Sequence, residues 1–481
     1  MNWRPTVERP NILWICTDQQ RYDTVACLGN PAIRTPNLDR LCKEGTAFTN
    51  AYCQSTVCSP SRASFLTGKY PSQIGIVANG QASVPEGTEL ITKELHRIGY
   101  RCGLCGKLHL ASPKNGIEDR CDDKYERFHY SHDSWYGTPD DNEYLRWLCD
   151  TGADLQRIFN TEHTSRRGYS KWITADKHQT TWCVQKAIDC IAEWELEQSE
   201  DPWLLSLNIF DPHPPFDAPQ EYADRYDPCA IPEPLFKDSD IRNQERLEEA
   251  YHQSALQYHK PDAETQKKKV SYYGMVELID EQVGRILDYL ESHDLRKKTL
   301  IIFHSDHGEM LGDHGLILKG ARFYEGATKV PMIFSLPGVV KEGKRYDYLV
   351  ELRDLIPTLK EMTGLGAEAE SLWRILTKDD HEPIRNHIIC EYLDSLWPEL
   401  SNKETVHHTT YATMCRDIRY KVVIYHTQQT GELYDLKEDP CEFENLWDRA
   451  SHREIQTKLM MRIMDHYMND LKPRTPIIWS F

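Results

Sequence analysis

The sequence contains no long hydrophobic run. Its longest apolar stretches are Ile12–Cys16, Leu300–Phe303 and Val330–Phe334, far short of the roughly 18 residues that a membrane-spanning helix needs. The residues before Asn11, MNWRPTVERP, contain no apolar core of the kind that marks a secretory signal. These absences argue against a membrane span and favour a cytoplasmic location.

Basic residues are also in short supply. The chain has 57 lysines and arginines against 75 acidic residues, which leaves a formal net charge of −18. A surface this acidic repels phosphate backbones and anionic lipid, so we expect neither nucleic acid nor membrane as a partner. A small anionic substrate is still compatible with this balance, because a pocket can carry local positive charge on an acidic body.

Cysteine is present but lacks the arrangement of a structural site. The 15 cysteines are odd in number and scattered, without the paired clusters of zinc sites or small disulfide frameworks. Buried thiols in a reducing compartment are the preferred interpretation. Only 25 glycines and 26 prolines occur among the 481 residues, and 40% of the residues are hydrophobic, which excludes a disordered or fibrous chain.

Short apolar runs alternate with helical patterns along the chain. The runs predicted as strands are Asn11–Thr17, Arg101–Cys105, Trp203–Phe210, Thr299–Ser305, Val330–Leu336 and Tyr420–His426. The segments predicted as helices are Pro36–Gly45, Ser59–Thr67, Leu90–Ile98, Thr181–Glu195 and Val270–Ser292. This alternation, with near-continuous apolar strands, predicts an α/β fold in which a large, mostly parallel sheet is sandwiched by helices.

The chain changes character after Gly366, where short antiparallel strands and a final helix near Glu454–Met468 are indicated. We therefore predict a large α/β domain over residues 1–366 and a smaller α+β domain over residues 367–481. Gly116–Ser170 and Asp238–Lys269 interrupt the alternating pattern. They are either insertions that shape a substrate mouth or ordinary surface loops.

Chemically active side chains follow four of the predicted strands: Asp18 and Gln19, Lys107 and His109, Asp211 and His213, and Asp306 and His307. Ligands of open α/β sheets bind beyond the carboxyl ends of the strands, so we expect these side chains to share one edge. Asp18, Gln19, Asp306 and His307 supply oxygen donors and an imidazole. That set suits one divalent cation of hard to borderline preference.

The segment from Cys58 to Gly68 reads CSPSRASFLTG. Ser59 can cap a helix and Pro60 fits its first turn, which predicts Cys58 at the positive end of a helix dipole. Arg62 lies one turn further along, on the same side. A nucleophile in this position beside a guanidinium is well placed to meet a tetrahedral oxyanion.

This segment resembles the sulfatase consensus, in which Cys-x-Pro-x-Arg directs oxidation of the cysteine to formylglycine. The resemblance covers most of the chain and implies the sulfatase branch of the alkaline-phosphatase-like superfamily. Its further elements are TDQQR at 17–21, TPNLD at 35–39, GKLH at 106–109, SDHGE at 305–309, Lys319, Tyr324-Glu325, Val330-Pro331, ELYDL at 432–436 and Asp439-Pro440.

The resemblance implies a role for each site residue. Cys58 would be the formylglycine nucleophile, stabilised by Arg62, and its hydrate would offer one hydroxyl for attack and a second whose deprotonation expels sulfate. Lys107 and His109 would hold and deprotonate these hydroxyls. His213 and Lys319 would contact the sulfate and assist the leaving group. The metal ligands would be Asp18, Gln19, Asp306 and His307, together with residue 58.

Three positions depart from the commoner family pattern, and one of them is Leu108, which stands where a Trp is frequent. Gln19 stands where many members carry a second Asp, and His307 where many carry Asn. Calcium is the first expectation for the metal, with manganese or magnesium as alternatives, because an imidazole and fewer carboxylates weaken the case for calcium. The same pattern occurs in the related phosphonate monoester hydrolases.

Three functions are therefore weighed. The first is a sulfatase that hydrolyses an aryl or carbohydrate sulfate, with a formylglycine-generating maturation enzyme as a partner. The second is a phosphonate monoesterase or phosphodiesterase that uses the same formylglycine and metal. The third is a non-catalytic binding homologue in which Cys58 stays unmodified. A homo-oligomer is left open.

Other candidate groups are given structural interpretations. A second metal on Asp211, Asp313 and His314 is disfavoured, because the Cys-x-Pro-x-Arg cysteine would then have no purpose. Cys102 and Cys105 have redox-motif spacing but lie in a predicted strand, where buried core thiols are expected. The remaining histidines without an evident partner, His293, His407 and His408, are interpreted as surface residues.

Overall fold

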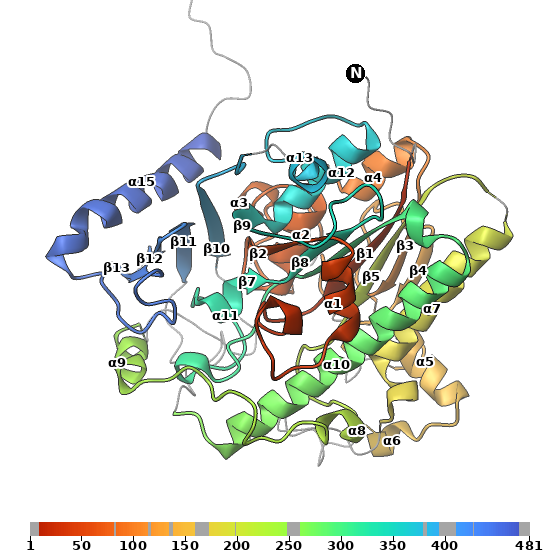
Figure 1. Cartoon of the computed structure of the whole chain (residues 1–481), viewed down its shortest axis with the longest axis horizontal. Coiled ribbons are helices and arrows are strands. Elements are labelled where there is room, and N and C mark those ends of the chain that lie inside the picture. Colours follow the sequence, from red (N-terminus) through yellow and green to blue (C-terminus); the bar gives the residue numbers. More distant parts are fainter. Residues whose placement is uncertain are drawn as a thin grey trace, which may run out of the picture.

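A computed structural model describes residues 9–80, 83–113, 117–133, 138–158, 173–197, 199–247, 260–378, 382–393, 410–426 and 428–470. These residues form a central nine-stranded sheet and a separate four-stranded sheet. Figure 1 shows the central sheet between two helical layers, with the second sheet and the helix α15 (Arg453–Asp470) to its side.

The central sheet has the strand order β4-β3-β5-β1-β6-β8-β2-β7, and β9 pairs with β2. From β4 to β6 all neighbours are parallel, whereas β8 is antiparallel to both β6 and β2. This arrangement confirms the predicted α/β fold with a mostly parallel sheet. The strands are β1 (Asn11–Thr17), β2 (Thr46–Tyr52), β3 (Arg101–Gly106), β4 (Arg127–Tyr130), β5 (Trp203–Ile209), β6 (Thr299–Ser305), β7 (Lys329–Val330), β8 (Met332–Ser335) and β9 (Lys344–Glu351).

Each face of the central sheet buries its own hydrophobic core. Along β1, Ile12 and Trp14 enter one core, and Leu13 and Ile15 enter the other. The first core is closed by α2 (Cys58–Thr67), α4 (Ile91–Arg97), α12 (Leu355–Thr363) and α13 (Trp373–Thr377). The second is closed by α1 (Pro36–Lys43), α7 (Gln179–Leu196) and α10 (Ala263–Ser292). Full burial of one Val, Leu, Ile, Phe or Met side chain contributes about 1.5–3 kcal/mol to the stability of the fold. The two cores therefore make the sheet, and with it the sheet's edge, a rigid support.

Other α-helices are also present in the described part of the chain. They are α3 (Pro71–Ile74), α5 (Glu143–Asp150), α6 (Leu155–Ile158), α8 (Gln220–Ala223), α9 (Asp238–Arg246) and α11 (Glu325–Thr328).

The second sheet is fully antiparallel, in the order β10-β11-β12-β13, and α15 packs on it. Its strands are β10 (His387–Leu393), β11 (Tyr411–Asp417), β12 (Tyr420–Tyr425) and β13 (Thr430–Asp435). The buried ammonium of Lys421 on β12 donates to Glu325 of α11 and to the carbonyl of Phe323, each at 2.9 Å, which ties this sheet to the central one. The antiparallel strands and final helix expected after Gly366 are thus confirmed, and the domain boundary at that residue stays a prediction.

Most predicted elements lie within a residue or two of those observed. The prediction of one strand over Val330–Leu336 is wrong, because Pro331 lacks an N–H group and separates β7 from β8. Residues 116, 134–137 and 159–170 of one predicted insertion and 248–259 of the other lie outside the described residues, as do His407 and His408.

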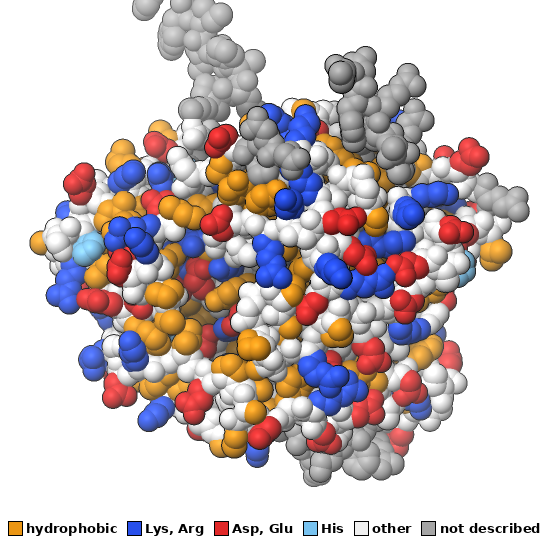
Figure 2. Space-filling model, in the orientation of Figure 1, with side chains coloured by type: hydrophobic (Ala, Val, Ile, Leu, Met, Phe, Trp, Pro, Cys, Tyr) orange, Lys and Arg blue, Asp and Glu red, His pale blue; other side chains and the backbone are white. Residues whose placement is uncertain are grey.

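The surface charges, the cysteines and the helices can be compared with the expectations from composition. Acidic and basic side chains are interspersed over the face shown in Figure 2. All 15 cysteines are free, and Cys102 and Cys105 are buried as predicted. Among the described helices, none has the length and apolar character needed to cross a membrane.

Candidate active site

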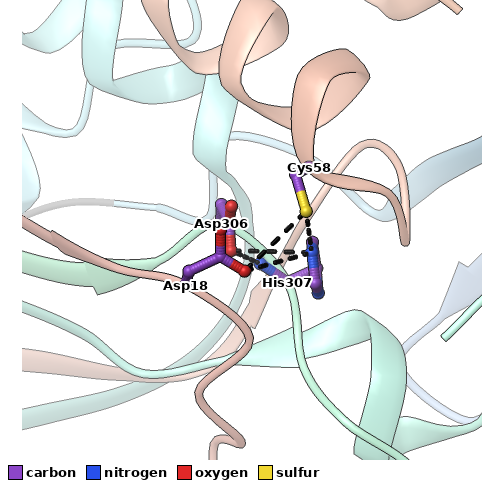
Figure 3. A group of neighbouring side chains, drawn as sticks. All are labelled: Asp18, Cys58, Asp306 and His307. Atoms are coloured by element: carbon purple, nitrogen blue, oxygen red, sulfur yellow. Dashed lines mark hydrogen bonds and ion pairs between the residues drawn. The ribbon is translucent and has the colours of Figure 1, made fainter. Parts of the chain in front are cut away.

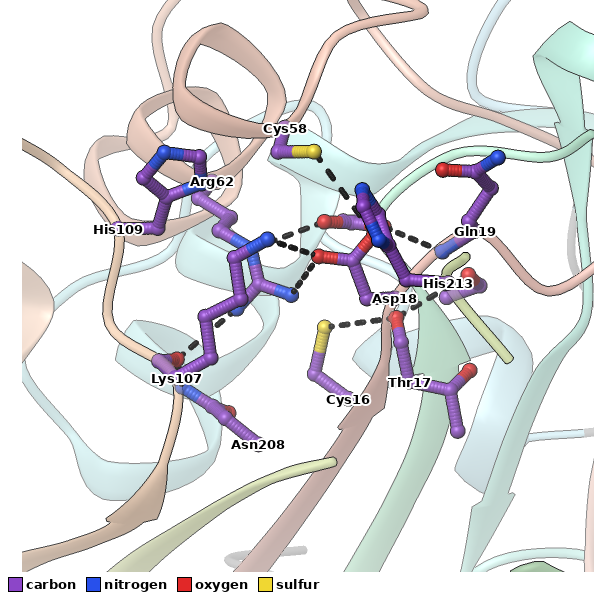
Figure 4. Close-up of polar contacts among 12 residues, drawn as sticks. Cys16, Thr17, Asp18, Gln19, Cys58, Arg62, Lys107, His109, Asn208 and His213 are labelled. Carbon is purple, nitrogen blue, oxygen red and sulfur yellow. Dashed lines mark hydrogen bonds and ion pairs between the residues drawn. The ribbon is translucent and has the colours of Figure 1, made fainter. Parts of the chain in front are cut away.

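The carboxyl ends of four adjacent strands carry the candidate site. β3, β5, β1 and β6 are neighbours in the sheet, so the residues that follow them meet at one edge. Figure 4 shows Cys58, Arg62, Lys107 and His213 gathered around Asp18. The expectation that these strand ends converge is therefore met by the geometry.

Asp18, Cys58, Asp306 and His307 form a fully buried group whose ligand atoms all lie within 4.8 Å of one another, and Figure 3 shows their side chains pointing toward a common centre. Nε2 of His307 lies 3.2 Å from the Cys58 sulfur and 3.7 Å from Oδ1 of Asp306. Its other ring nitrogen, Nδ1, lies 2.9 Å from the carbonyl oxygen of Gly308. Because a carbonyl only accepts, Nδ1 carries a proton, which leaves Nε2 as the ring nitrogen that faces the group.

The four side chains of this group are electron-rich, so a positive charge among them would stabilise them. Burial and the nearby Asp18 carboxylate raise the pKa of Asp306. Burial and the Lys319 ammonium oppose protonation of His307, yet the Asp306 carboxylate and the Cys58 sulfur still raise the pKa of that imidazole. Two buried carboxylates that face a third electron-rich group are stabilised by a cation among them.

Lys319 supplies such a cation. Its Nζ donates to Oε1 of Gln19 at 2.6 Å and to the Cys58 sulfur at 2.9 Å, and it lies 3.2 Å from Nε2 of His307. Oδ1 of Asp18 is 3.9 Å away. A positive charge thus already contacts or faces most of the predicted ligands, and oxygen, amide and imidazole donors of this kind suit a divalent ion. The residues fit the metal that the motifs imply.

Arg62 and Lys107 balance the two aspartates. The buried guanidinium of Arg62 donates from Nε to Asp306 at 2.8 Å and from Nη2 to Asp18 at 3.2 Å. Nζ of Lys107 donates to the same Asp18 oxygen at 2.5 Å. Burial and the Cys58 sulfur oppose ionisation of Asp18, but Lys107, His213 and Lys319 hold the pKa of its carboxyl well below the usual range. Arg62, predicted to stabilise the nucleophile, therefore directs two donors at the aspartates, and its Nη1 donates to the carbonyl oxygen of Lys107 at 3.0 Å.

Cys58 is the first residue of α2, with Val57 at the N-cap. The prediction that Ser59 caps this helix is wrong, because its backbone N–H donates to Oδ1 of Asn79 at 2.9 Å and its hydroxyl makes no hydrogen bond among the described residues. The predicted place of Cys58 at the positive helix end is nevertheless correct. Although burial opposes it, the ammonium groups of Lys107 and Lys319 hold the pKa of the Cys58 thiol well below its usual range.

His109 lies beside the sulfur on a strained turn, with φ 56°. Burial, and after it the Lys107 ammonium, lowers the pKa of His109 to about 4, so the ring is neutral near pH 7 and able to accept a proton. Three consecutive backbone N–H groups, of residues 109, 110 and 111, donate to the carboxylate of Glu118. This buried carboxylate holds the turn in place.

His213 is half-buried on the loop after β5. Its Nδ1 lies 2.6 Å from the carbonyl oxygen of Pro214 and therefore donates a proton to it. The opposite nitrogen, Nε2, is then the one left for another partner, and it donates to an anion only when the ring carries a second proton. Its ring packs on Phe210, with ring centroids 4.7 Å apart, and Lys107 lies over the same aromatic ring.

Several nearby residues escaped the sequence patterns. The ring of His132 lies 4.5 Å from that of His109, and Nε2 of His132 and Nδ1 of His109 are both buried without a hydrogen bond among the described residues. His132 and Glu118 come from a stretch without periodicity, and Asn79 from an irregular loop, so no local signal marks them. Only their types, an imidazole, a carboxylate and an amide, could have suggested them.

The residues weighed for a second metal have other partners. Asp313 pairs with Arg21 at 2.8 Å, and His314 contacts Asp240 at 2.9 Å. Asp211 groups instead with His178 and Asp217, and it accepts a hydrogen bond from the Thr180 hydroxyl. Asp211, Asp313 and His314 therefore do not form a second metal site beside Cys58.

Comparison with known proteins identifies the family of the chain. The family described as sulfatase matches residues 10–365. The chain belongs to the sulfatase family. A second family, described as "N-sulphoglucosamine sulphohydrolase, C-terminal", matches residues 312–469. The chain is therefore a sulfatase-family hydrolase, as its motifs indicated.

Sulfatase relatives cover nearly the whole chain. An arylsulfatase of Clostridium perfringens is 30% identical over 472 residues, which cover 93% of this chain and 92% of that protein. A choline-sulfatase of Rhizobium meliloti is 27% identical and covers 92% of this chain and 83% of its own length. The phosphonate monoester hydrolase of Agrobacterium radiobacter superposes with a TM-score of 0.78 at 23% identity, over 96% of both chains. This likeness confirms the alkaline-phosphatase-like fold.

Proposed function

We propose that the protein is a sulfatase that hydrolyses an aryl or carbohydrate sulfate ester, with formylglycine at residue 58 and one divalent metal. The observation that carries this proposal is the place of Cys58. It begins helix α2, its sulfur lies 2.9 Å from Nζ of Lys319, and it faces Asp18, Asp306 and His307 at the sheet edge. A modified nucleophile there would meet both the metal and the cationic side chains that a sulfate requires.

The metal would be held by Asp18, Gln19, Asp306, His307 and residue 58. Calcium is the first candidate, with manganese and magnesium as alternatives, and it would supply Lewis acidity toward a sulfate oxygen. Hydrated formylglycine would supply one hydroxyl that attacks sulfur and a second whose deprotonation releases the sulfate. An unmodified thiol, a soft donor, matches these oxygen ligands poorly.

The side chains around residue 58 divide the remaining work. Lys107 and Arg62 fix Asp18 and Asp306 in place, and Lys319 and His213 would bind the oxygens of the sulfate. His109 would accept the proton of the second hydroxyl, because the lowered pKa of its imidazole keeps the ring unprotonated near pH 7. Three cationic side chains, Arg62, Lys107 and Lys319, against the carboxylates of Asp18 and Asp306 leave one net positive charge before any metal binds, which favours a small anion such as a sulfate monoester.

The specificity of the site is tested by paired substrates. We expect turnover of an aryl sulfate to exceed that of an aryl phosphonate monoester, with Cys58→Ala as the inactive control. A strong preference for the phosphonate would instead establish the second function, a phosphonate monoester hydrolase, which Gln19 and His307 favour because those enzymes share this pattern.

The modification is tested by the mass of the peptide that contains Cys58, from protein made in cells with the maturation machinery. We expect the loss of one sulfur and two hydrogens and the gain of one oxygen. An unmodified Cys58, together with no turnover of either ester, would support the non-catalytic binding homologue.

A further inference from the structure

Glu309 is a buried carboxylate that none of the proposed catalytic steps uses. It is 0% exposed and lies two residues beyond His307. Among the described residues, its side chain accepts hydrogen bonds from three N–H donors: the side-chain amide of Gln19 and the backbone N–H groups of Leu311 and Leu318. Three N–H donors are thus directed at the two acceptor oxygens of one side chain.

The contact with Gln19 decides which end of that amide faces the site. An amide has one oxygen and one NH₂ group, and its orientation follows from its partners. Oε2 of Glu309 receives the NH₂ of Gln19, so the amide oxygen points the other way, where Nζ of Lys319 donates to it at 2.6 Å. With the amide reversed, NH₂ would face the ammonium and any metal.

The second oxygen of Glu309 acts on the loop that carries Lys319. Leu311 and Leu318 have φ values of 48° and 66°, in the left-handed region that L-residues rarely adopt. Oε1 of Glu309 accepts from the backbone N–H groups of both. Leu318 directly precedes Lys319, so this oxygen helps to present the ammonium.

We propose that Glu309 is a positioning residue that orients the Gln19 amide, so that its oxygen faces the metal, while anchoring the Lys319 loop. This inference rests on the metal site of the proposed function. It explains how an amide serves at a position where many family members carry a carboxylate: an aspartate presents oxygen in either orientation, whereas a glutamine needs an outer acceptor to fix its oxygen inward.

Glu309→Gln separates the two tasks. Its oxygen can keep both loop hydrogen bonds, but its new NH₂ group then meets the NH₂ of Gln19, and one amide has to reverse. The exchanged pair, Gln19→Glu with Glu309→Gln, restores every hydrogen bond, because the amide introduced at position 309 would donate to the new carboxylate at position 19. A loop-anchoring role alone would not be sensitive to this difference.

The experiment measures Mn²⁺ and Ca²⁺ affinity of the full-length protein, stripped by a chelator and titrated calorimetrically. We expect Glu309→Gln to weaken binding by about 10–100-fold, as for other residues that orient a metal ligand. We expect the exchanged pair to bind at least as tightly as the wild type. Glu391→Gln is the matched control, because Glu391 is equally buried and accepts from Ser72 and His466 in another part of the fold.

Binding by Glu309→Gln within twofold of the wild type would overturn the inference. So would an exchanged pair that binds no more tightly than the single variant or, if the single variant does not fold, more weakly than the wild type. A wild-type protein that binds neither ion, nor Mg²⁺ in the same titration, would instead overturn the metal site of the proposed function, so the two failures are distinguishable.

Discussion

Lys319 is the residue whose removal tests the proposed chemistry most directly. Its Nζ contacts Gln19, Cys58 and His307 at 2.6, 2.9 and 3.2 Å. Lys319→Met keeps most of the side-chain volume and removes the charge and all three donors. The variant therefore lacks the positively charged donor that would bind a sulfate oxygen.

The expected loss follows from the setting of this ammonium. Lys319 is 2% exposed, so water screens its charge little. Removal of one preorganised donor from such a site costs about 10²–10³ in kcat, or about 2.7–4 kcal/mol of transition-state stabilisation. We expect Lys319→Met and Lys319→Ala to lose this much in kcat for an aryl sulfate, with a smaller change in KM, because charge on the leaving oxygen grows in the transition state.

Lys421→Met is the matched control. Lys421 is fully buried and donates to Glu325 and to a carbonyl, but it lies on β12 of the other sheet. Its loss should lower the melting temperature and leave kcat per folded molecule within about threefold of the wild type. A Lys319→Met variant that keeps kcat within tenfold of the wild type would refute the role assigned to this ammonium.

Three further predictions concern the surroundings of the nucleophile. Glu118→Gln should lower the free energy of unfolding by about 1–3 kcal/mol, because an amide satisfies fewer of the three N–H groups that Glu118 accepts; unchanged chemical denaturation would contradict this. Since the pKa of His109 is lowered to about 4, the acid limb of kcat/KM should lie well below pH 6.5, and His109→Gln should abolish it. The same shift makes the unfolded chain bind more protons, so this residue's contribution to stability is complete above about pH 6.5 and falls as the pH drops toward 4. Removal of metal by a chelator should abolish turnover and lower the melting temperature, and reloading with Ca²⁺, Mn²⁺ or Mg²⁺ separately should show which ion restores both.

The parts of the site that were predictable are those set by strand ends. Residues after parallel strands need no long-range information to be placed together, because the sheet brings their carboxyl ends to one edge. Asp18 follows β1 and Asp306 follows β6, and both strands coincide residue for residue with the apolar runs that predicted them. The side chains of these two residues consequently meet in the predicted group.

The supporting residues were not predictable for a physical reason. Glu118 acts through backbone N–H groups that any sequence offers, so it leaves no pattern in residue types. Glu309 stands in the SDHGE motif, but its contact with the far end of the Gln19 amide is not something that the motif specifies. The pairing of β2 with β9 joins segments about 300 residues apart, as in Ala51 with Val350, and no local periodicity announces it. The prediction of a Ser59 cap on α2 was wrong for the same reason. The acceptor for the first turn of this helix is Oδ1 of Asn79, which lies 20 residues further along the chain and accepts from the backbone N–H of Ser59.

The acidic composition and the cationic site are compatible because they concern different parts of the molecule. Arg62, Lys107 and Lys319 are all nearly fully buried, so they make a small share of the surface charge. Their field acts over a few ångströms in a low dielectric, where an interaction is several-fold stronger than at the surface. The acidic exterior is screened by salt within about 10 Å. Rising ionic strength should therefore speed the encounter with an anionic ester, and it should change kcat much less, because the buried charges that act on the bound sulfate are hardly screened.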